Sequence, residues 1–304
     1  MDKSVRINRK KNAIRVSKGE RIFYIVNYFI LTLLGITALY PFLITLANSL
    51  SGSRAILAGE VVLFPVDFSL EAYYQITTAA KIFDTMANTV YLTIIGTLLN
   101  MLVTIMCAYP LSKKDFPGKN LCVTILTSTM FFGGGLIPTF ILMKSLHLMD
   151  TYLCLWLLGL FSIYNMIILR TFFSGLPPEL EESAKIDGAN DIVVLIRIAL
   201  PLSKAVLATL TLFYAVGWWN SYMSPLLYIS SPDKAVLMLK LKQLLDQSQL
   251  AQNHPEEIGV VRPVIAPESF KAASIIVSTV PILCVYPFLQ KYFVKGVMIG
   301  SIKG

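Results

Sequence analysis

Long apolar stretches alternate with short polar ones along the chain. Each of six windows runs for 18 residues or more without an Asp, Glu, Lys or Arg: 22–53, 85–112, 120–143, 151–169, 205–232 and 272–290. A helix of roughly 20 apolar residues crosses the hydrocarbon core of a bilayer. The windows lack the period of a strand, and a helix satisfies its own backbone in lipid. The pattern predicts an all-α integral membrane protein with six transmembrane helices, over about 22–50, 86–112, 120–144, 151–170, 205–230 and 272–291.

Composition agrees with this pattern. Of the 304 residues, 55% are hydrophobic and only 14% are charged, and the mean hydropathy is +0.66. Soluble domains carry about 25% charged residues. The composition therefore excludes a soluble enzyme, a nucleic-acid binder and a secreted disulfide scaffold. All four cysteines fall inside the apolar windows without the spacing of a metal or disulfide site, which is typical of small buried residues.

The distribution of basic residues predicts the orientation in the membrane. With six spans both termini lie on one side, and that side carries 18 of the 26 Lys and Arg residues. Because basic residues are in excess on the cytoplasmic side, both termini are expected in the cytoplasm. The expected organisation is a basic tail 1–21, a transmembrane domain 22–294 with outer loops 51–85 and 231–271, a cytoplasmic loop 174–201, and a C-terminal tail 295–304.

Two further segments each allow more than one structural interpretation. Residues 235–245 form an amphipathic pattern in the second outer loop, which predicts a helix on the membrane surface, with a packed lid or a docking surface as the alternatives. Gly133, Gly134, Gly135 and Pro138 interrupt the third span. We expect a kink or close helix packing there, and a substrate gate is the alternative.

The cytoplasmic loop reads as a helix-turn-helix. Pro177 and Pro178 favour a first turn, and the glutamates that follow stabilise the positive end of a helix. Gly188 ends this helix with a left-handed cap. Asn190 or Asp191 caps a second helix, which continues to a proline and joins the fifth span. A surface helix fixed to a span acts as a lever, since whatever moves the helix also moves the span.

The same loop matches a family pattern: Glu-Ala-Ala, three residues, Gly, nine residues, then Ile-x-Leu-Pro. Here the spacing is intact and Ser183 replaces the middle alanine. The loop resembles the cytoplasmic coupling loop of binding-protein-dependent ABC importer permeases. The resemblance implies that the ATPase-coupling residues are Glu182, Ser183, Ala184, Asp187, Gly188, Ala189, Ile198, Leu200 and Pro201.

Other motifs are similar to the carbohydrate-uptake branch of this family, and the run 134–139 is similar to its smaller permeases for complex and uronate-type oligosaccharides. The resemblance implies a multi-pass subunit of a bacterial cell membrane. Its partners would be a second homologous permease in a heterodimer, two ATPase subunits, an extracellular solute-binding protein, membrane lipid and an oligosaccharide, but no nucleic acid. It also implies that the C-terminal tail contacts the ATPases through Lys295, Gly296, Lys303 and Gly304.

The chain lacks a phosphate-binding G-x-x-x-x-G-K-[ST] loop, so ATP and magnesium are expected on the partner ATPases and not on this subunit. We therefore expect a transport subunit and no enzyme, catalytic residue or metal site. Polar and aromatic residues in the windows are candidates for the substrate pathway, with ordinary packing as the alternative: Asn88, Asn100, Asn165, Trp218, Trp219 and Asn220.

Three other functions are alternatives to an oligosaccharide importer. An ABC importer permease for a non-sugar solute would share the coupling loop. A secondary transporter usually places ionisable residues within the membrane, and the six windows contain no charged residue. An intramembrane enzyme would need a nucleophile beside a base, and no histidine falls in a window.

Overall fold

The computed structural model describes residues 17–79, 81–253 and 266–300, and their regular structure is helical. Apart from one isolated bridge between Ser51 and Phe68, these residues contain no strand, which confirms the all-α prediction. The α-helices are α1 Lys18–Ser49, α2 Ser53–Leu57, α3 Glu71–Ala79, α4 Ile82–Ser112, α5 Lys119–Ser128, α6 Leu136–Ser145, α7 Tyr152–Leu158, α8 Ile163–Ser174, α9 Pro178–Ile186, α10 Asp191–Val194, α11 Leu200–Leu202, α12 Lys204–Trp219, α13 Met223–Tyr228, α14 Leu237–Asn253 and α16 Pro267–Gly300.

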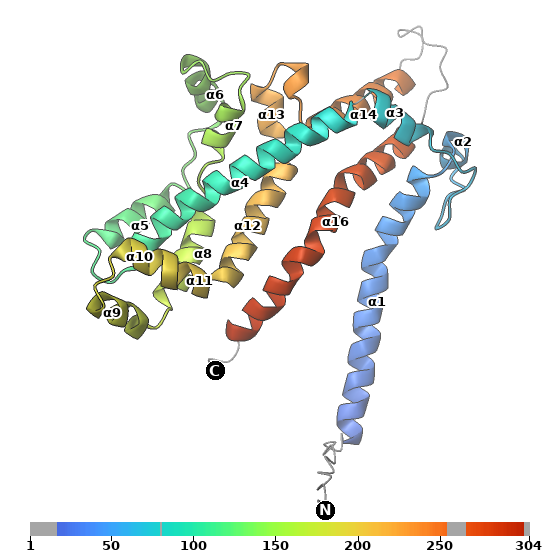
Figure 1. Cartoon of the computed structure of the whole chain (residues 1–304). Coiled ribbons are helices and arrows are strands. Elements are labelled where there is room, and N and C mark those ends of the chain that lie inside the picture. Colours follow the sequence, from blue (N-terminus) through green and yellow to red (C-terminus); the bar gives the residue numbers. More distant parts are fainter. Residues whose placement is uncertain (1–16, 80, 254–265, 301–304) are drawn as a thin grey trace, which may run out of the picture.

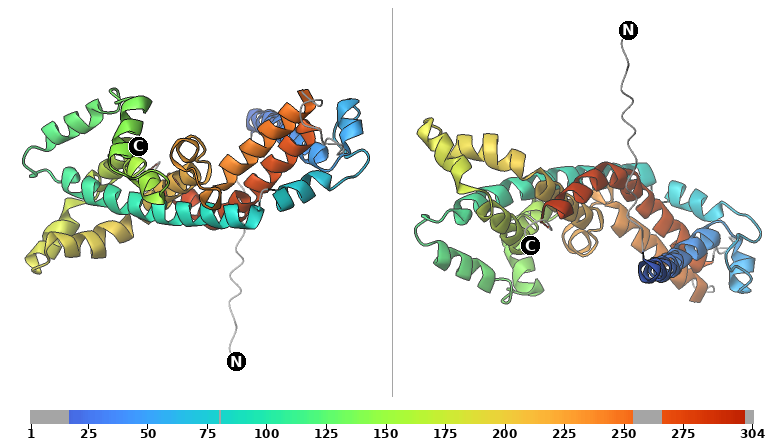
Figure 2. Two further views of the ribbon diagram at one scale, coloured as in Figure 1. Left: turned by 90° about the horizontal axis from the view of Figure 1, so that it is seen from above. Right: turned by 90° about the horizontal axis from the view of Figure 1, so that it is seen from below.

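Helix α4 is the central element. Its 31 residues extend about 46 Å at 1.5 Å per residue. It packs against α8 and α12, while α16 packs against α12, α14 and α1 (Figure 1). Seen from above and below, α4 runs along the length of the molecule (Figure 2). The helices of the segment 174–201, α9 to α11, lie near one of its ends, and α1, α3 and α14 gather near the other.

Three apolar clusters follow α4 from end to end. The first cluster joins the start of α4 to α3, α14 and α16 through Ala72, Ile76, Ile82, Trp219, Leu237, Leu241, Phe270 and Ala273. The middle cluster includes Leu92, Met143, Cys154, Leu155, Trp218 and Tyr228. The third joins the end of α4 to α8 and α12 through Ala108, Tyr109, Leu111, Met166, Leu169, Phe173, Ala199 and Leu210. Burial of this apolar surface holds the spans together.

Two helices of the described chain are each long and apolar enough to cross a membrane. They are α1, over Gly19–Ser49, and α4, over Ile82–Ser112. The count rises to four if each of two bent helix pairs forms one span. The predicted third span is divided into α5, which ends at Ser128, and α6, which begins after Gly135; this glycine is the N-cap residue of α6 and has a φ of +82°. The predicted fourth span is divided into α7 and α8, which meet at 55°.

The break in the fourth span was not predicted. Gly159 follows the last residue of α7, and the Ser162 side chain caps α8 by accepting a bond from the Asn165 amide. The break leaves the Gly159 carbonyl without a helical partner, and the Asn100 side chain donates a hydrogen bond to it. A neighbouring helix thus resatisfies the backbone, as the membrane requires.

Helix α14 is longer than the predicted 235–245 and starts later. Leu237, Leu239 and Leu241 are buried, and α14 packs against α16 and α4. The described structure therefore favours the packed-lid alternative over a helix lying on the membrane surface. In α1, by contrast, the apolar side chains from Ile22 to Leu43 are exposed on the isolated chain.

Candidate functional site

The candidate site is the helix-turn-helix formed by α9, α10 and α11. Pro178 is the first residue of α9, and Glu179 and Glu181 lie in its first turn, as predicted. Gly188 has a φ of +83°, and its amide donates to the Lys185 carbonyl at 3.0 Å. The Asn190 side chain caps α10 by accepting a bond from the Val193 amide at 2.9 Å. The local sequence signals for the turn and the caps are confirmed.

The second helix leads directly to the fifth predicted span. A π-helical turn, Leu195–Ala199, connects α10 to α11, so that the chain is helical from Asp191 to Leu202. This segment meets α12 at 83°. Ser203 forms the corner and is fully buried. The chain therefore passes from α11 to α12 through a one-residue corner, with no loop between the two helices.

The residues of the family pattern form an accessible surface on this motif. Glu182, Ser183, Asp187 and Gly188 are exposed, and Pro201 is exposed at the start of the corner. Ala184, Ala189, Ile198 and Leu200 are half-buried. No residue of α9 is fully buried. The motif thus offers polar and small side chains to a partner while its backbone is fixed by hydrogen bonds within the loop.

Sequence reasoning missed the apolar part of this surface. Ile186, Ile192 and Ile196 are 86%, 67% and 57% exposed. They lie on both sides of the turn at Gly188, so the motif presents isoleucines beside its polar residues. Isoleucines directly next to Asp187, Asp191 and Arg197, in a loop rich in charged residues, are the signal that could have identified them. Exposed apolar side chains rimmed by polar ones are typical of a protein-binding surface.

Charged residues tie the motif together. Glu181 pairs with Lys185 one turn later, at 3.0 Å, and with Lys113 at the end of α4. Lys185 also lies 3.5 Å from Asp191 in α10. Burial works against ionisation of Glu181, but the hydrogen bonds from the two lysines outweigh it and lower the pKa of this carboxyl. The carboxylate is therefore charged at neutral pH.

The candidates for the substrate pathway make contacts within the chain. The Asn88 amide donates to the carbonyls of Asp233 and Ala235, at 2.7 and 3.0 Å. The Trp218 indole donates to Asn100 at 2.6 Å, and the Trp219 indole donates to the Ser278 carbonyl at 3.0 Å.

The two remaining candidates differ in exposure. Asn165 is buried, whereas Asn220 is exposed and donates to the Val216 carbonyl at 2.9 Å. These contacts agree with the packing alternative for most of the set, and the role in the substrate pathway stays a prediction.

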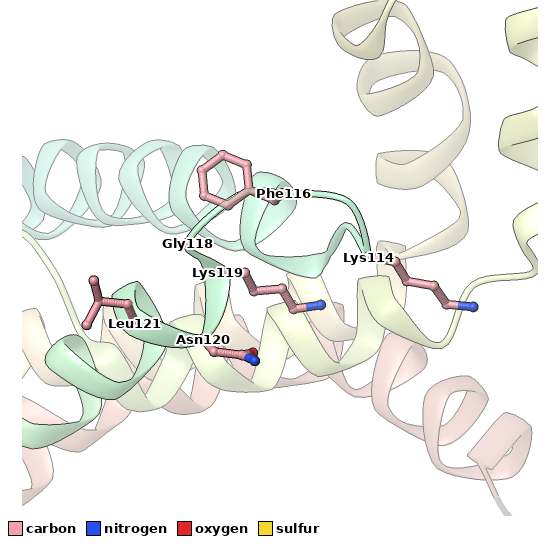
Figure 3. A pocket seen from close by; sticks show the side chains of 6 residues that line it. All are labelled: Lys114, Phe116, Gly118, Lys119, Asn120 and Leu121. Carbon is pink, nitrogen blue, oxygen red and sulfur yellow. The ribbon is translucent and has the colours of Figure 1, made fainter.

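The predicted tails at the two ends of the chain are described only in part. The helix α16 continues through positions 295 and 296, whereas Lys303, Gly304 and most of the tail 1–21 lie outside the described residues. The described part of the chain contains no group of three His, Cys, Asp or Glu side chains that could hold a metal. The turn between α4 and α5 has a shallow, open hollow of about 320 Å³ lined by Lys114, Phe116, Gly118, Lys119, Asn120 and Leu121 (Figure 3).

Comparison with known proteins identifies close relatives. Residues 100–299 match the family described as "Binding-protein-dependent transport system inner membrane component". Protein LplC of Bacillus subtilis (strain 168) is 41% identical over 95% of this chain and 97% of its own length. The polygalacturonan/rhamnogalacturonan transport system permease protein YtcP of the same organism is 39% identical over 93% of this chain and 99% of its own length.

A solved structure has the same fold. It is a chain from the crystal structure of a bacterial ABC transporter involved in the import of the acidic polysaccharide alginate, and it superimposes with a TM-score of 0.77. The two chains are 32% identical, and the match covers 91% of this chain and 98% of the other.

Proposed function

The chain belongs to the family of binding-protein-dependent transport system inner membrane components, and on this premise we propose that it is one permease subunit of an ATP-driven importer of oligosaccharides. It is a transport subunit and not an enzyme. The observation that carries the proposal is the exposed helix-turn-helix of α9 to α11, in which the spacing from Glu182 to Pro201 is intact. Its continuity with α12 supports a role in coupling.

The proposed complex contains two permeases and two ATPase subunits. ATP and magnesium bind to the ATPases, whose closure carries the two coupling loops towards each other. The exposed residues Glu182 and Asp187, together with the isoleucines around Gly188, form the surface that fits an ATPase groove. The corner at Ser203 transmits the displacement to α12, and the spans then open towards the binding protein that delivers the sugar.

We propose six spans with both termini in the cytoplasm of a bacterial cell. In this proposal each remaining span consists of two consecutive helices, α5 with α6, α7 with α8 and α12 with α13, or of the long helix α16. The start of α1, the end of α16 and the helices α9 to α11 all lie lower in the view of Figure 1 than α3, α13 and α14. This arrangement supports an even number of crossings, and the excess of basic residues supports the cytoplasmic side.

We propose oligosaccharides of the uronate type as the first substrates to test. Two relatives are named for the transport of polygalacturonan/rhamnogalacturonan and for the import of the acidic polysaccharide alginate. The chain covers more than nine-tenths of both relatives. An arabinooligosaccharide permease from Halalkalibacterium halodurans is 27% identical, so its substrate is a weaker guide.

The proposal is tested by deleting this subunit and measuring uptake. We expect loss of uptake of one class of oligosaccharide, with uptake of amino acids, metals and peptides unchanged, and restoration by the wild-type chain on a plasmid. Purification under mild detergent should retrieve a second permease and an ATPase, identified by mass spectrometry. Loss of amino-acid or metal uptake with every glycan phenotype intact would show that the sugar assignment is wrong.

A further inference from the structure

The inner end of α4 is held by donors from two neighbouring elements. Arg170 Nε donates to the Leu111 carbonyl at 2.9 Å, and Ser174 Oγ donates to the Ser112 carbonyl at 3.2 Å. Lys119 Nζ donates to the carbonyl of Lys113, the residue that follows α4, at 3.0 Å. The last carbonyls of a helix have no partner within it, and cations are favoured there. The end of α4, α8 and the start of α5 therefore form one bonded unit.

From this unit one side chain reaches α9. Lys113 Nζ forms an ion pair with Glu181 and lies 4.1 Å from the centroid of the Tyr109 ring. The Lys113 and Glu181 side chains are only 24% and 27% exposed. Tyr109 is buried and meets Phe173 of α8 edge to face at 5.7 Å. The Lys113 amine is therefore held between the Tyr109 ring of α4 and the Glu181 carboxylate of α9.

This pair differs from the other ion pairs of the described chain. Glu181–Lys185 lies within α9, and Lys185–Asp191 joins α9 to α10, so both stay inside the coupling loop. Lys113–Glu181 is the pair, among the described residues, that joins α9 to a long spanning helix. Because α9 has no fully buried residue, apolar packing contributes little to its attachment. A partly buried pair is also screened less by salt than an exposed one.

We propose that the Lys113–Glu181 pair is a second transmission link, through which movement of the coupling loop reaches α4 at the same time as it reaches α12. The inference rests on the proposed function, since it assumes that a partner displaces α9. One path is covalent and runs through α10, α11 and the corner at Ser203. The other is electrostatic and enters α4, which packs along α12. The two residues position α4 and take no part in ATP chemistry.

The first test is a charge swap in the full complex, reconstituted in lipid vesicles. Lys113→Glu and Glu181→Lys should each lower ATP-dependent oligosaccharide uptake at least about tenfold, within the range of typical coupling energies. The swapped double variant should recover to within about threefold of wild type, because the two charges attract again. Milder variants, Lys113→Gln and Glu181→Gln, serve if a reversed charge prevents assembly, and each should assemble and still lose uptake.

Two lysines provide matched controls. Lys114 is exposed, forms no ion pair with a described residue, and its amine lies away from the apolar side chains of the α4–α5 turn (Figure 3). Lys114→Glu makes the same charge change one residue away and should leave uptake near wild type. Lys185→Gln removes only the pairs inside the loop, so its loss should be smaller than that of Lys113→Gln.

The second test measures movement directly. In a cysteine-free background, spin labels at Glu179→Cys on α9 and Met106→Cys on α4 sit at exposed positions. The distance between them should stay the same with and without ATP if α9 and α4 move together. With Glu181→Gln added, the same distance should change when ATP binds.

The outcomes separate the link from the function. A wild-type complex with no ATP-dependent uptake would contradict the proposed function itself. A wild-type complex that transports, with Glu181→Gln and Lys113→Gln also transporting normally, would overturn only the link. So would a double swap that assembles without recovery, or a wild-type distance between α9 and α4 that changes with ATP.

Discussion

At the scale of the residue, two glycines have different physical reasons to be glycine. Gly188 has a positive φ of 83°, and no atom lies within 4 Å of the place where a Cβ would be. Its constraint is therefore purely conformational. Gly96 lies in the regular helix α4, but a Cβ there would be 2.5 Å from the Trp218 ring. Its constraint is therefore steric, and the two sites predict different consequences of substitution.

Gly188→Val should uncouple the transporter without preventing membrane insertion. A left-handed conformation costs a residue with a Cβ about 1–2 kcal/mol, and a β-branched residue more. The turn between α9 and α10 would shift, and we expect loss of uptake and of substrate-stimulated ATP hydrolysis in reconstituted complexes. Gly188→Asn is the matched control, because asparagine tolerates positive φ, and it should keep most activity. Normal uptake by the valine variant would contradict the lever.

Gly96→Ala should destabilise the helix packing between α4 and α12. The added methyl would overlap the Trp218 ring, and overpacking of this kind typically costs about 1–3 kcal/mol. Thermal unfolding of the purified complex in detergent measures the effect. Gly217→Ala in α12 is the control, since its Cβ would meet nothing within 4 Å, and it should be neutral or slightly stabilising. Equal melting temperatures for wild type and Gly96→Ala would show that Trp218 does not occupy this position.

At the scale of the element, polar side chains fasten connections that the apolar core does not cover. Asp150, in the turn between α6 and α7, accepts bonds from the Ser230 and Ser231 amides, both at 2.9 Å, and from Lys234 Nζ at 3.2 Å. Asn88 fixes the same segment from α4. The start of the second outer loop is thus attached to two other elements, which positions α14 for packing.

Asp150→Asn should weaken this attachment through charge alone. Asp150 has a φ of +60°, which asparagine also tolerates. The hydrogen bonds from Ser231 outweigh burial and lower the pKa of the Asp150 carboxyl well below its ordinary value. A depressed folded pKa stabilises the protein above the unfolded value of about 4, and this contribution is lost as the pH falls further.

We therefore expect the Asp150→Asn complex to be less stable than wild type by roughly 1–3 kcal/mol at pH 7. The difference should shrink only below about pH 4, and melting curves at pH 7, 5 and 3.5 measure it. Asp246→Asn is the control, because the Lys242–Asp246 pair is 44% and 47% exposed and contributes little. A difference that is the same at all three pH values would contradict the role of the Asp150 charge.

At the scale of the whole molecule, a long central helix connects two groups of shorter helices that lie near its two ends. The coupling loop lies near the end of α4, and α3 and α14 lie near its start (Figure 1). The three apolar clusters connect these ends through α8, α12 and α16. The proposed coupling would use these packed helices to carry movement from one end of α4 to the other.

The proposed orientation predicts which positions a membrane-impermeant thiol reagent can reach in intact cells. In a cysteine-free background, Asp115→Cys in the α4–α5 turn should resist labelling, whereas Val62→Cys and Leu250→Cys should react. All three residues are exposed on the isolated chain, so burial within it does not explain a difference. Labelling of Asp115→Cys should appear once the cells are permeabilised. The reverse pattern would place the coupling loop outside and overturn the proposal.

The sequence by itself determined the features that depend on neighbours along the chain. Apolar windows require only the length of a helix and the thickness of a bilayer. The turn at Gly188 and the cap at Asn190 depend on residues within one helical turn, so they were predicted correctly. The proposal that α9 to α11 form a coupling loop has the same local basis, since the motif is a spacing of residues in the sequence.

Only the tertiary structure decided how distant residues pair. Asn100 donates the hydrogen bond that satisfies the break at Gly159. Leu237 and Leu241 are the side chains through which α14 packs on its neighbours, and Lys113 forms the ion pair that attaches α9. Each of these polar or apolar groups has several possible partners in the sequence. The partner that each group meets is set by the spatial arrangement in which α4, α8, α12 and α16 pack. This arrangement results from burying all the apolar faces together, and no local pattern in the sequence predicts it.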